Sequence, residues 1–109
     1  MDGAPGGGRR GARPAKLSPS DVAARLPALS GWTLEAGKLH KSFTFKDFVE
    51  AWRFMSAVAL VAETMGHHPE WSNVWNRVTV DLSTHDAGGL TTLDFELAAR
   101  MEALAGPRS

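Results

Sequence analysis

The spacing of apolar and polar positions divides the chain into segments with strand-like and helix-like periods. In residues 77–84 the apolar positions alternate strictly with polar ones, which is typical of a strand that buries one face. Residues 38–45 show the same period, and a short turn joins them to a smaller strand at 32–34. Residues 71–75 precede the strand at 77–84, with Asn76 at the turn between them. These segments predict two β-hairpins.

Three further segments have the helical spacing of apolar positions. A short helix is expected to begin after Ser18, a suitable N-cap, and to end at Pro27. A long helix is predicted over residues 47–66 and a final one over residues 91–106, each closed by a glycine. The core-facing positions expected on the long helix are Phe48, Ala51, Trp52, Met55, Val58, Ala59 and Ala62. Those expected on the final helix are Leu93, Leu97, Met101 and Leu104.

The order of these elements, α-β-β-α-β-β-α, predicts the fold class. Two hairpins separated by a helix favour an α+β fold, in which a four-stranded antiparallel sheet carries helices packed on one face. A sheet of four short strands leaves at least one edge open, and an open edge invites pairing between subunits. Together, the predicted strands and helices are expected to form one folded domain over residues 17–106.

Residues 1–16 differ from the rest of the chain in composition and charge. They contain the run Gly6-Gly7-Gly8 and too few apolar side chains to offset the entropy cost of ordering, so we expect a disordered Gly/Pro/Arg-rich leader. Their net charge is +3, whereas that of residues 17–109 is −3, which makes the formal charge of the whole chain zero. A folded domain that is negative overall is a poor match for phosphate backbones, and we expect no nucleic-acid partner.

Length and composition narrow the class of protein further. The 109 residues suffice for one modest core, and 43% hydrophobic with 22% charged residues is ordinary for a globular domain. No apolar run approaches the roughly 20 residues needed to span a bilayer, so we expect no membrane association, and the N-terminus has no apolar signal segment. The absence of cysteine excludes disulfides, thiolate nucleophiles and Cys-ligated zinc, and it fits a reducing cytoplasm.

A cluster of histidines is the strongest chemical signal in the chain. His67, His68 and His85 are three of the four histidines and lie within nineteen positions. Imidazole has the unperturbed pKa nearest to neutral pH, so a cluster of it indicates proton transfer or metal binding. His67 and His68 occupy the connection from a helix to a strand, and His85 follows the strand at 77–84. If the two hairpin segments pair, the three rings could converge on one site.

Several candidate residues have simpler structural explanations. Asp94 could serve only the start of the final helix, as part of a capping box, and Glu63 could be a solvated helix residue. His40 is expected to be a polar surface residue. Trp71 and Trp75 share one strand face by alternation, where they could be core residues or a flat wall for an aromatic ligand.

Zinc is the main chemical alternative to proton transfer. Three histidines would suit a catalytic zinc site with three protein ligands and a water. However, adjacent histidines such as His67 and His68 rarely bind one metal together on a regular element, and the chain has no HExxH motif. We therefore expect no metal site.

At these residues the chain resembles a known family, the pterin-4a-carbinolamine dehydratases. The matching signature consists of Glu63, the run His67-His68-Pro69, Trp75, His85 and Asp94. Further matching segments are Phe43-x-Phe45-Lys46-Asp47-Phe48, His68-Pro69-Glu70-Trp71, Leu82-Ser83-Thr84-His85 and Gly88-Gly89-Leu90-Thr91. The resemblance covers roughly residues 18–105 and is closer to bacterial members than to animal ones. Trp75 departs from the pattern, because tyrosine is common at that position.

The resemblance implies an activity and a role for each matching residue. Family members dehydrate 4a-hydroxytetrahydrobiopterin, the carbinolamine released by aromatic amino acid hydroxylases, to quinonoid dihydropterin and water, without a metal or a cofactor. It implies that His67 and His85 form the acid–base pair and that His68 positions the pterin. The residues implied to orient these imidazoles or to bind the polar edge of the pterin are Glu63, Asp94, Ser83 and Thr84.

The resemblance also implies partners and leaves two alternative functions open. Members of the family form homodimers or homotetramers and support tetrahydrobiopterin recycling beside a hydroxylase. Animal members also bind the dimerisation helices of a homeodomain transcription factor, so the first alternative is a non-catalytic interaction or coactivator module. The second is an accessory protein of molybdopterin metabolism. The complete set of matching histidines and carboxylates argues against a module without activity.

Overall fold

The computed structural model describes residues 14–107, which form helices and a single antiparallel sheet. Most of the predicted leader, residues 1–13, lies outside the described residues, and residues 14–16 have no regular secondary structure. The α-helices and strands are, in order, α2 (Pro19–Arg25), β1 (Thr33–Glu35), β2 (Lys38–Thr44), α3 (Phe48–Met65), β3 (Glu70–Val74), β4 (Arg77–Leu82) and α4 (Thr92–Ala105). Two short 3₁₀ turns, η1 (Leu26–Ala28) and η2 (His85–Ala87), follow α2 and β4.

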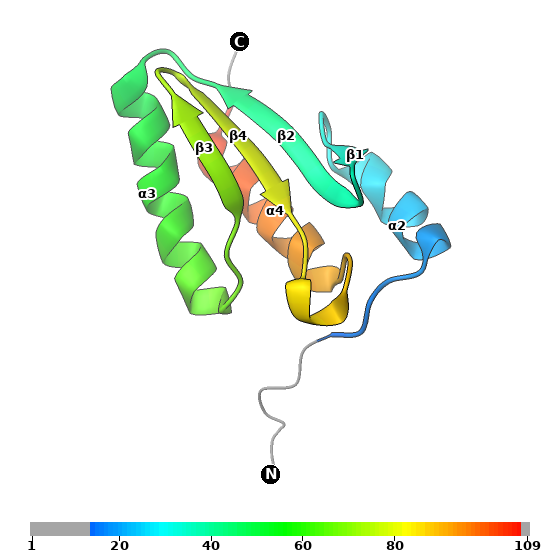
Figure 1. The fold of residues 1–109 in the computed structure, drawn as a ribbon. Helices are drawn as coiled ribbons and strands as arrows, with labels where there is room; N and C mark the ends of the chain where they lie inside the picture. Colours follow the sequence, from blue (N-terminus) through cyan, green and yellow to red (C-terminus); the bar gives the residue numbers. More distant parts are fainter. Residues whose placement is uncertain (1–13, 108–109) are drawn as a thin grey trace.

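The sheet has the strand order β1-β2-β4-β3, and all neighbouring strands are antiparallel (Figure 1). The two hairpins therefore lie side by side, with β2 and β4 as the central strands. Helices α3 and α4 pack against each other and cover one face of the sheet. This arrangement confirms the predicted α+β fold with helices on one face. Within residues 14–107, no helix is both long and apolar enough to cross a membrane.

The core lies between the helices and the inward rows of β2 and β4. Leu39 and Phe43 on β2 are fully buried, as are Val78 and Val80 on β4. Phe43 pairs with Val78 across the two strands, and the Phe43 and Phe54 rings lie 4.8 Å apart between β2 and α3. Burial at every second strand position confirms the alternation predicted from the sequence, and it ties the sheet firmly to α3.

The other face of the sheet carries mostly polar and charged side chains, two pairs of which are in contact. On this face Lys38 forms an ion pair of 2.6 Å with Glu70, and the His40 Nδ1 atom lies 2.9 Å from the Asp81 Oδ1 atom. The hydrogen bond to Glu70 raises the pKa of Lys38. His40 thus lies on the sheet face opposite the helices, paired with a carboxylate.

The apolar stripe predicted for α3 included exposed residues and omitted one buried residue. The buried positions are Ala51, Phe54, Val58 and Ala62, so Phe54 belongs to the core although the stripe omitted it. Phe48 and Trp52 are 49% and 55% exposed, and their rings lie 5.9 Å apart on the helix surface. Ala59 is also exposed. At about 100° per residue these positions point away from the sheet, so α3 carries one apolar face toward the core and another toward solvent.

Three further predictions differ from the structure at the ends of elements. Trp75 is not on the face of β3 beside Trp71, because the strand ends at Val74 and Trp75 occupies the turn with a φ of 50° and 65% exposure. A two-residue hairpin turn favours a positive φ, and Trp75 adopts it. Leu104, in the last turn of α4, is 41% exposed rather than buried. Trp32 precedes β1 and is buried, with its indole N–H donating to the Glu102 Oε2 atom at 2.8 Å.

Candidate active site

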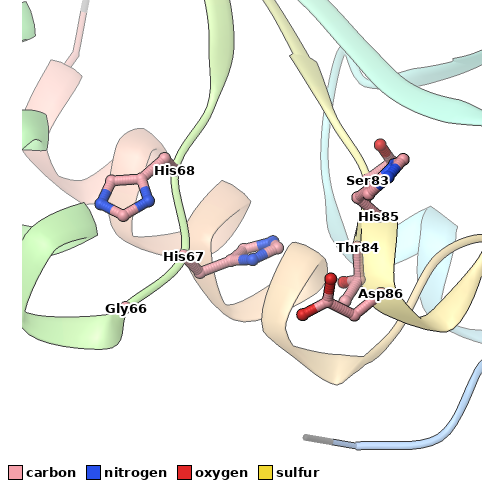
Figure 2. Close-up of a pocket in the computed structure, with 7 residues that line it drawn as sticks. All are labelled: Gly66, His67, His68, Ser83, Thr84, His85 and Asp86. Carbon is pink, nitrogen blue, oxygen red and sulfur yellow. The ribbon is translucent and has the colours of Figure 1, made fainter.

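A pocket of about 190 Å³ lies where the connection from α3 to β3 faces the turn after β4. Figure 2 shows that the His67 ring extends from the first segment toward the wall formed by the second, whereas the His68 ring points away from that wall. The residues that line the pocket are Gly66, His67, His68, Ser83, Thr84, His85 and Asp86. The two histidine segments predicted from the sequence therefore meet in one pocket.

The end of α3 places the first pair of histidines. Gly66 adopts the left-handed conformation with a φ of 64°, which a glycine reaches without steric cost. The backbone N–H of His67 then donates to the Ala62 carbonyl at 3.0 Å, which fixes the chain as it leaves the helix. Pro69 leads into β3 at Glu70. As a result the His67 side chain turns inward and is buried, while His68 stays exposed.

The end of β4 places the opposite wall. Thr84 forms a bridge with Gly89, and its backbone N–H donates to the Gly89 carbonyl at 2.9 Å. The chain between these residues folds into the turn η2, which presents His85 and Asp86 at the surface of the pocket. The His85 ring forms no hydrogen bond with any residue in the 14–107 range, so both of its nitrogens are available to a ligand.

Lys16 and Leu17 hold this turn from outside. The Leu17 N–H donates to the Leu90 carbonyl at 2.8 Å, and the Lys16 side chain lies against Gly89. A Cβ atom at Gly89 would approach the Lys16 Cε atom to 2.7 Å. The N-terminal segment, the Gly88-Gly89 turn and the pocket wall are thus packed together.

A buried hydrogen bond to a carboxylate anchors His67. Its Nε2 atom lies 2.6 Å from the Oδ1 atom of Asp94, which has no solvent exposure. The second carboxylate oxygen, Oδ2, accepts from the Thr84 hydroxyl at 2.8 Å and from the Thr91 backbone N–H at 2.9 Å. The bond from Thr91 is half of the capping box that starts α4, so Asp94 caps the helix and contacts the histidine at the same time.

The second histidine–carboxylate pair is very different in its surroundings. The His68 Nε2 atom lies 2.9 Å from the Glu63 Oε1 atom, but the two side chains are 63% and 82% exposed. A pair in water contributes at most about 1 kcal/mol to stability. The pair of His68 and Glu63 therefore orients the His68 ring at the pocket rim and adds little to the stability of the fold.

The structure thus places some of the predicted site residues in the lining of one pocket and the others directly behind that lining. His67, His68, His85, Ser83 and Thr84 line it, whereas Glu63 and Asp94 contact the histidines from behind. Sequence reasoning did not single out Asp86, although its position next to His85 was a usable signal. Thr91 was recognised only as a helix cap. Among residues 14–107, no group of three or more His, Asp or Glu side chains is arranged to hold a metal ion.

The arrangement has the chemical properties of an acid–base site. Two imidazoles from different segments reach one open pocket, and an imidazole can donate or accept a proton near neutral pH. One imidazole, that of His67, is held by a hydrogen bond to a buried carboxylate. The fold and the pocket together define a small α+β domain with a histidine-lined site suited to proton transfer.

Comparison with known proteins identifies the family. The family model described as pterin 4 alpha carbinolamine dehydratase matches residues 15–104. A relative from Solibacter usitatus, which carries the provisional name pterin-4-alpha-carbinolamine dehydratase, is 56% identical over 90 residues, spanning 83% of this chain and 95% of the relative. The chain therefore belongs to the pterin-4-alpha-carbinolamine dehydratase family, as the sequence signature predicted.

Two solved structures share the fold. One is described as a transcriptional coactivator/pterin dehydratase from Brucella melitensis, with a TM-score of 0.81 and 46% identity over 84% of this chain and 99% of that chain. The other is described as a pterin dehydratase-like protein that is a RuBisCO assembly factor in the alpha-carboxysome. It has a TM-score of 0.58 and 27% identity over 71% of this chain and 89% of that one. These two similar proteins are thus described in terms of both catalysis and protein interaction.

Proposed function

We propose that this protein dehydrates 4a-hydroxytetrahydrobiopterin to quinonoid dihydropterin and water by histidine acid–base catalysis. The observation that carries the proposal is the pocket in which His67, backed by buried Asp94, faces the turn that holds His85. Membership of the dehydratase family supports the same reaction. The reaction requires an acid and a base within reach of one substrate, and this pocket offers both.

The chemistry has two proton movements. The C4a–O bond breaks while a proton is delivered to the departing 4a-hydroxyl, which leaves as water. A base removes the proton from N5, and the electron pair of the N5–H bond forms the C4a=N5 double bond. His67 and His85 approach the pocket from two segments, so one can act as acid and the other as base. A positioned acid or base typically contributes about 10²–10⁴-fold.

The remaining lining residues are assigned to binding and orientation. His68 positions the pterin, and Glu63 holds the His68 ring through its hydrogen bond of 2.9 Å. Ser83 lines the same wall and can bind the polar edge of the pterin. We add Asp86 to this group, because a carboxylate accepts hydrogen bonds and the amino-pyrimidine edge of a pterin presents N–H donors.

The physiological context follows from the substrate. A 4a-carbinolamine is the product of an aromatic amino acid hydroxylase, so the protein is proposed to act beside such an enzyme in tetrahydrobiopterin recycling. The cysteine-free sequence fits a cytoplasmic location. An accessory role in molybdopterin metabolism would involve a different pterin, and comparison of turnover on both pterins separates these pathways.

An interaction module is the second candidate function. The two similar proteins described as a coactivator and as an assembly factor favour this function. The two candidates differ in one measurable property, because a non-catalytic module would bind its partner and leave the rate of pterin dehydration unchanged.

We further propose that the protein is a homodimer or homotetramer that buries the exposed apolar face of α3. The supporting observation is the group of large apolar side chains on this helix, which are 49–73% exposed. Isolated exposed apolar residues are common, but several on one helix indicate an interface. These residues are Phe48, Val49, Trp52 and Leu60.

Replacing Trp52 by glutamate should lower the oligomeric state. A charge at a buried interface is desolvated without a partner, so the dimer or tetramer should dissociate at micromolar concentration. Sedimentation velocity of wild type and Trp52→Glu measures the change. The matched control is Ala24→Glu on α2, which introduces the same charge at an exposed helix position away from α3 and from the sheet edges. A Trp52→Glu variant with the wild-type sedimentation coefficient would contradict the interface.

The direct test of the proposed activity is the dehydration rate of freshly generated 4a-hydroxytetrahydropterin, with and without the EDTA-treated protein. We expect acceleration that survives the chelator. Folded protein without any effect on the rate would reject the dehydratase and favour the interaction module. Acceleration that is lost on chelation and restored by zinc would instead indicate a metal-dependent site.

A further inference from the structure

The buried carboxylate of Asp94 is the end point of a chain of hydrogen bonds that runs through two threonines. The Leu93 backbone N–H donates to the Thr91 hydroxyl oxygen at 3.2 Å. The hydroxyl oxygens of Thr91 and Thr84 lie 2.7 Å apart, and the Thr84 hydroxyl lies 2.8 Å from the Asp94 Oδ2 atom. Both threonine side chains are buried, with exposures of 0% and 3% for Thr91 and Thr84.

The direction of each hydrogen bond follows from the donors available. An ionised carboxylate only accepts, so the single Thr84 hydroxyl proton points to Asp94. That proton is then no longer available for Thr91, so the Thr91 hydroxyl must donate to Thr84. The Thr91 oxygen in turn accepts from the Leu93 N–H, which can only donate. The hydrogen bonds therefore all point toward Asp94. The Oδ2 atom accepts two of them, one from the Thr84 hydroxyl and one from the Thr91 backbone N–H.

The other carboxylate oxygen of Asp94 likewise determines which group donates to it. The Oδ1 atom faces the His67 Nε2 atom at 2.6 Å, so that nitrogen must carry the proton. The Nδ1 atom of His67 forms no hydrogen bond with the described part of the chain. Because His67 lines the pocket, Nδ1 is the ring nitrogen left for a ligand.

We infer that Thr84 and Thr91 are positioning residues, which hold Asp94 so that His67 is fixed with its proton on Nε2 and presents Nδ1 to the substrate. This inference rests on the proposed function for its catalytic meaning. It also gives the Thr84 hydroxyl a different role from the pterin contact predicted from the sequence, because that hydroxyl is committed to Asp94. Proton transfer by His67 then takes place at Nδ1, and the charge on the ring is balanced by Asp94.

Long-range ¹H–¹⁵N correlation of the ¹⁵N-labelled protein tests the assignment without reference to activity. At alkaline pH, where an unperturbed imidazole is neutral, His67 should show a protonated Nε2 and an unprotonated Nδ1. His40→Ala, His68→Ala and His85→Ala samples assign three of the four histidine ring signals, and the fourth belongs to His67. A neutral His67 ring that carries its proton on Nδ1 would overturn the inference in the wild-type protein itself, so this measurement needs no folded threonine variant.

Thr84→Val and Thr84→Ser test the threonine relay. Valine has a similar shape without the hydroxyl, whereas serine keeps it. We expect Thr84→Val to give a mixture of His67 tautomers and a kcat about tenfold lower with little change in KM, and Thr84→Ser to restore both values. A wild-type tautomer ratio in Thr84→Val would overturn the relay. If the wild-type protein lacks dehydratase activity but shows the expected tautomer and its loss in Thr84→Val, the proposed function fails while the positioning network stands.

Discussion

Replacing His85 by alanine should lower kcat for dehydration by about 10²–10⁴-fold, because the variant lacks one member of the proposed acid–base pair. Thermal stability should stay close to wild type. The His85 side chain is exposed on the turn η2 and forms no hydrogen bond with residues 14–107, so its loss leaves no buried group unpaired. Steady-state turnover with parallel thermal melts separates the two effects.

His40→Ala is the matched control for this variant. His40 is a partly buried histidine on the polar face of the sheet, where it contacts Asp81 at 2.9 Å, and it is not among the residues that line the pocket. Its replacement removes one imidazole from the protein but none from the site, so turnover should be unchanged. Equal losses in both variants, or wild-type turnover in His85→Ala, would contradict the assignment of His85.

Replacing Asp94 by alanine should lower both stability and turnover. The carboxylate is fully buried, caps α4 and accepts from Thr84, Thr91 and His67. Loss of a helix cap costs up to about 2 kcal/mol, and each buried donor left unpaired costs about 1–3 kcal/mol. We expect a decrease of about 2–4 kcal/mol in the free energy of unfolding, measured by urea denaturation. Turnover should fall because the His67 ring loses the carboxylate that orients it.

Asp47→Ala separates capping from catalysis. Asp47 caps α3 and accepts from the Glu50 backbone N–H at 2.8 Å, without any contact to a histidine. This variant should lose about 1 kcal/mol of stability and keep its turnover. If Asp94→Ala were as active as Asp47→Ala at a temperature where both are folded, Asp94 would be a structural cap and nothing more.

Much of the fold could be predicted from the sequence because local signals agreed with tertiary packing. Strict alternation at Val78, Val80 and Leu82 predicted a strand with one buried face, and all three side chains are fully buried. The start of α2 was predicted from Ser18, and Asp21 does donate its backbone N–H to the Ser18 hydroxyl. Such caps and periods depend on neighbours along the chain, which a sequence contains directly.

The errors came from features that depend on tertiary contacts. Apolar residues occupy more than one face of α3, so spacing alone did not distinguish Phe54, which reaches the core, from Trp52, which is exposed. A hydrophobic pattern identifies apolar surface but not what covers it. Trp75 fits the alternation of β3, and only the turn geometry shows that the strand ends one residue earlier.

For the site, the sequence identified the residue types but not their geometry. From the sequence, His67, His68 and His85 could converge only if their two segments pair, and the structure places all three around one pocket. The capping box of Asp94 was readable from its spacing to Thr91. Its second contact, to a histidine 27 positions away, depends on how α4 packs against the end of α3. No local sequence pattern indicates that these two side chains are in contact.

The most direct test of the central claim compares wild type with the double variant His67→Ala/His85→Ala on freshly generated 4a-hydroxytetrahydropterin, both after EDTA treatment. Circular dichroism confirms that each sample is folded before the rates are measured. We expect wild type to accelerate dehydration strongly and the double variant to return the rate to near the uncatalysed value. Dehydration by the double variant at close to the wild-type rate would contradict histidine acid–base catalysis in this pocket.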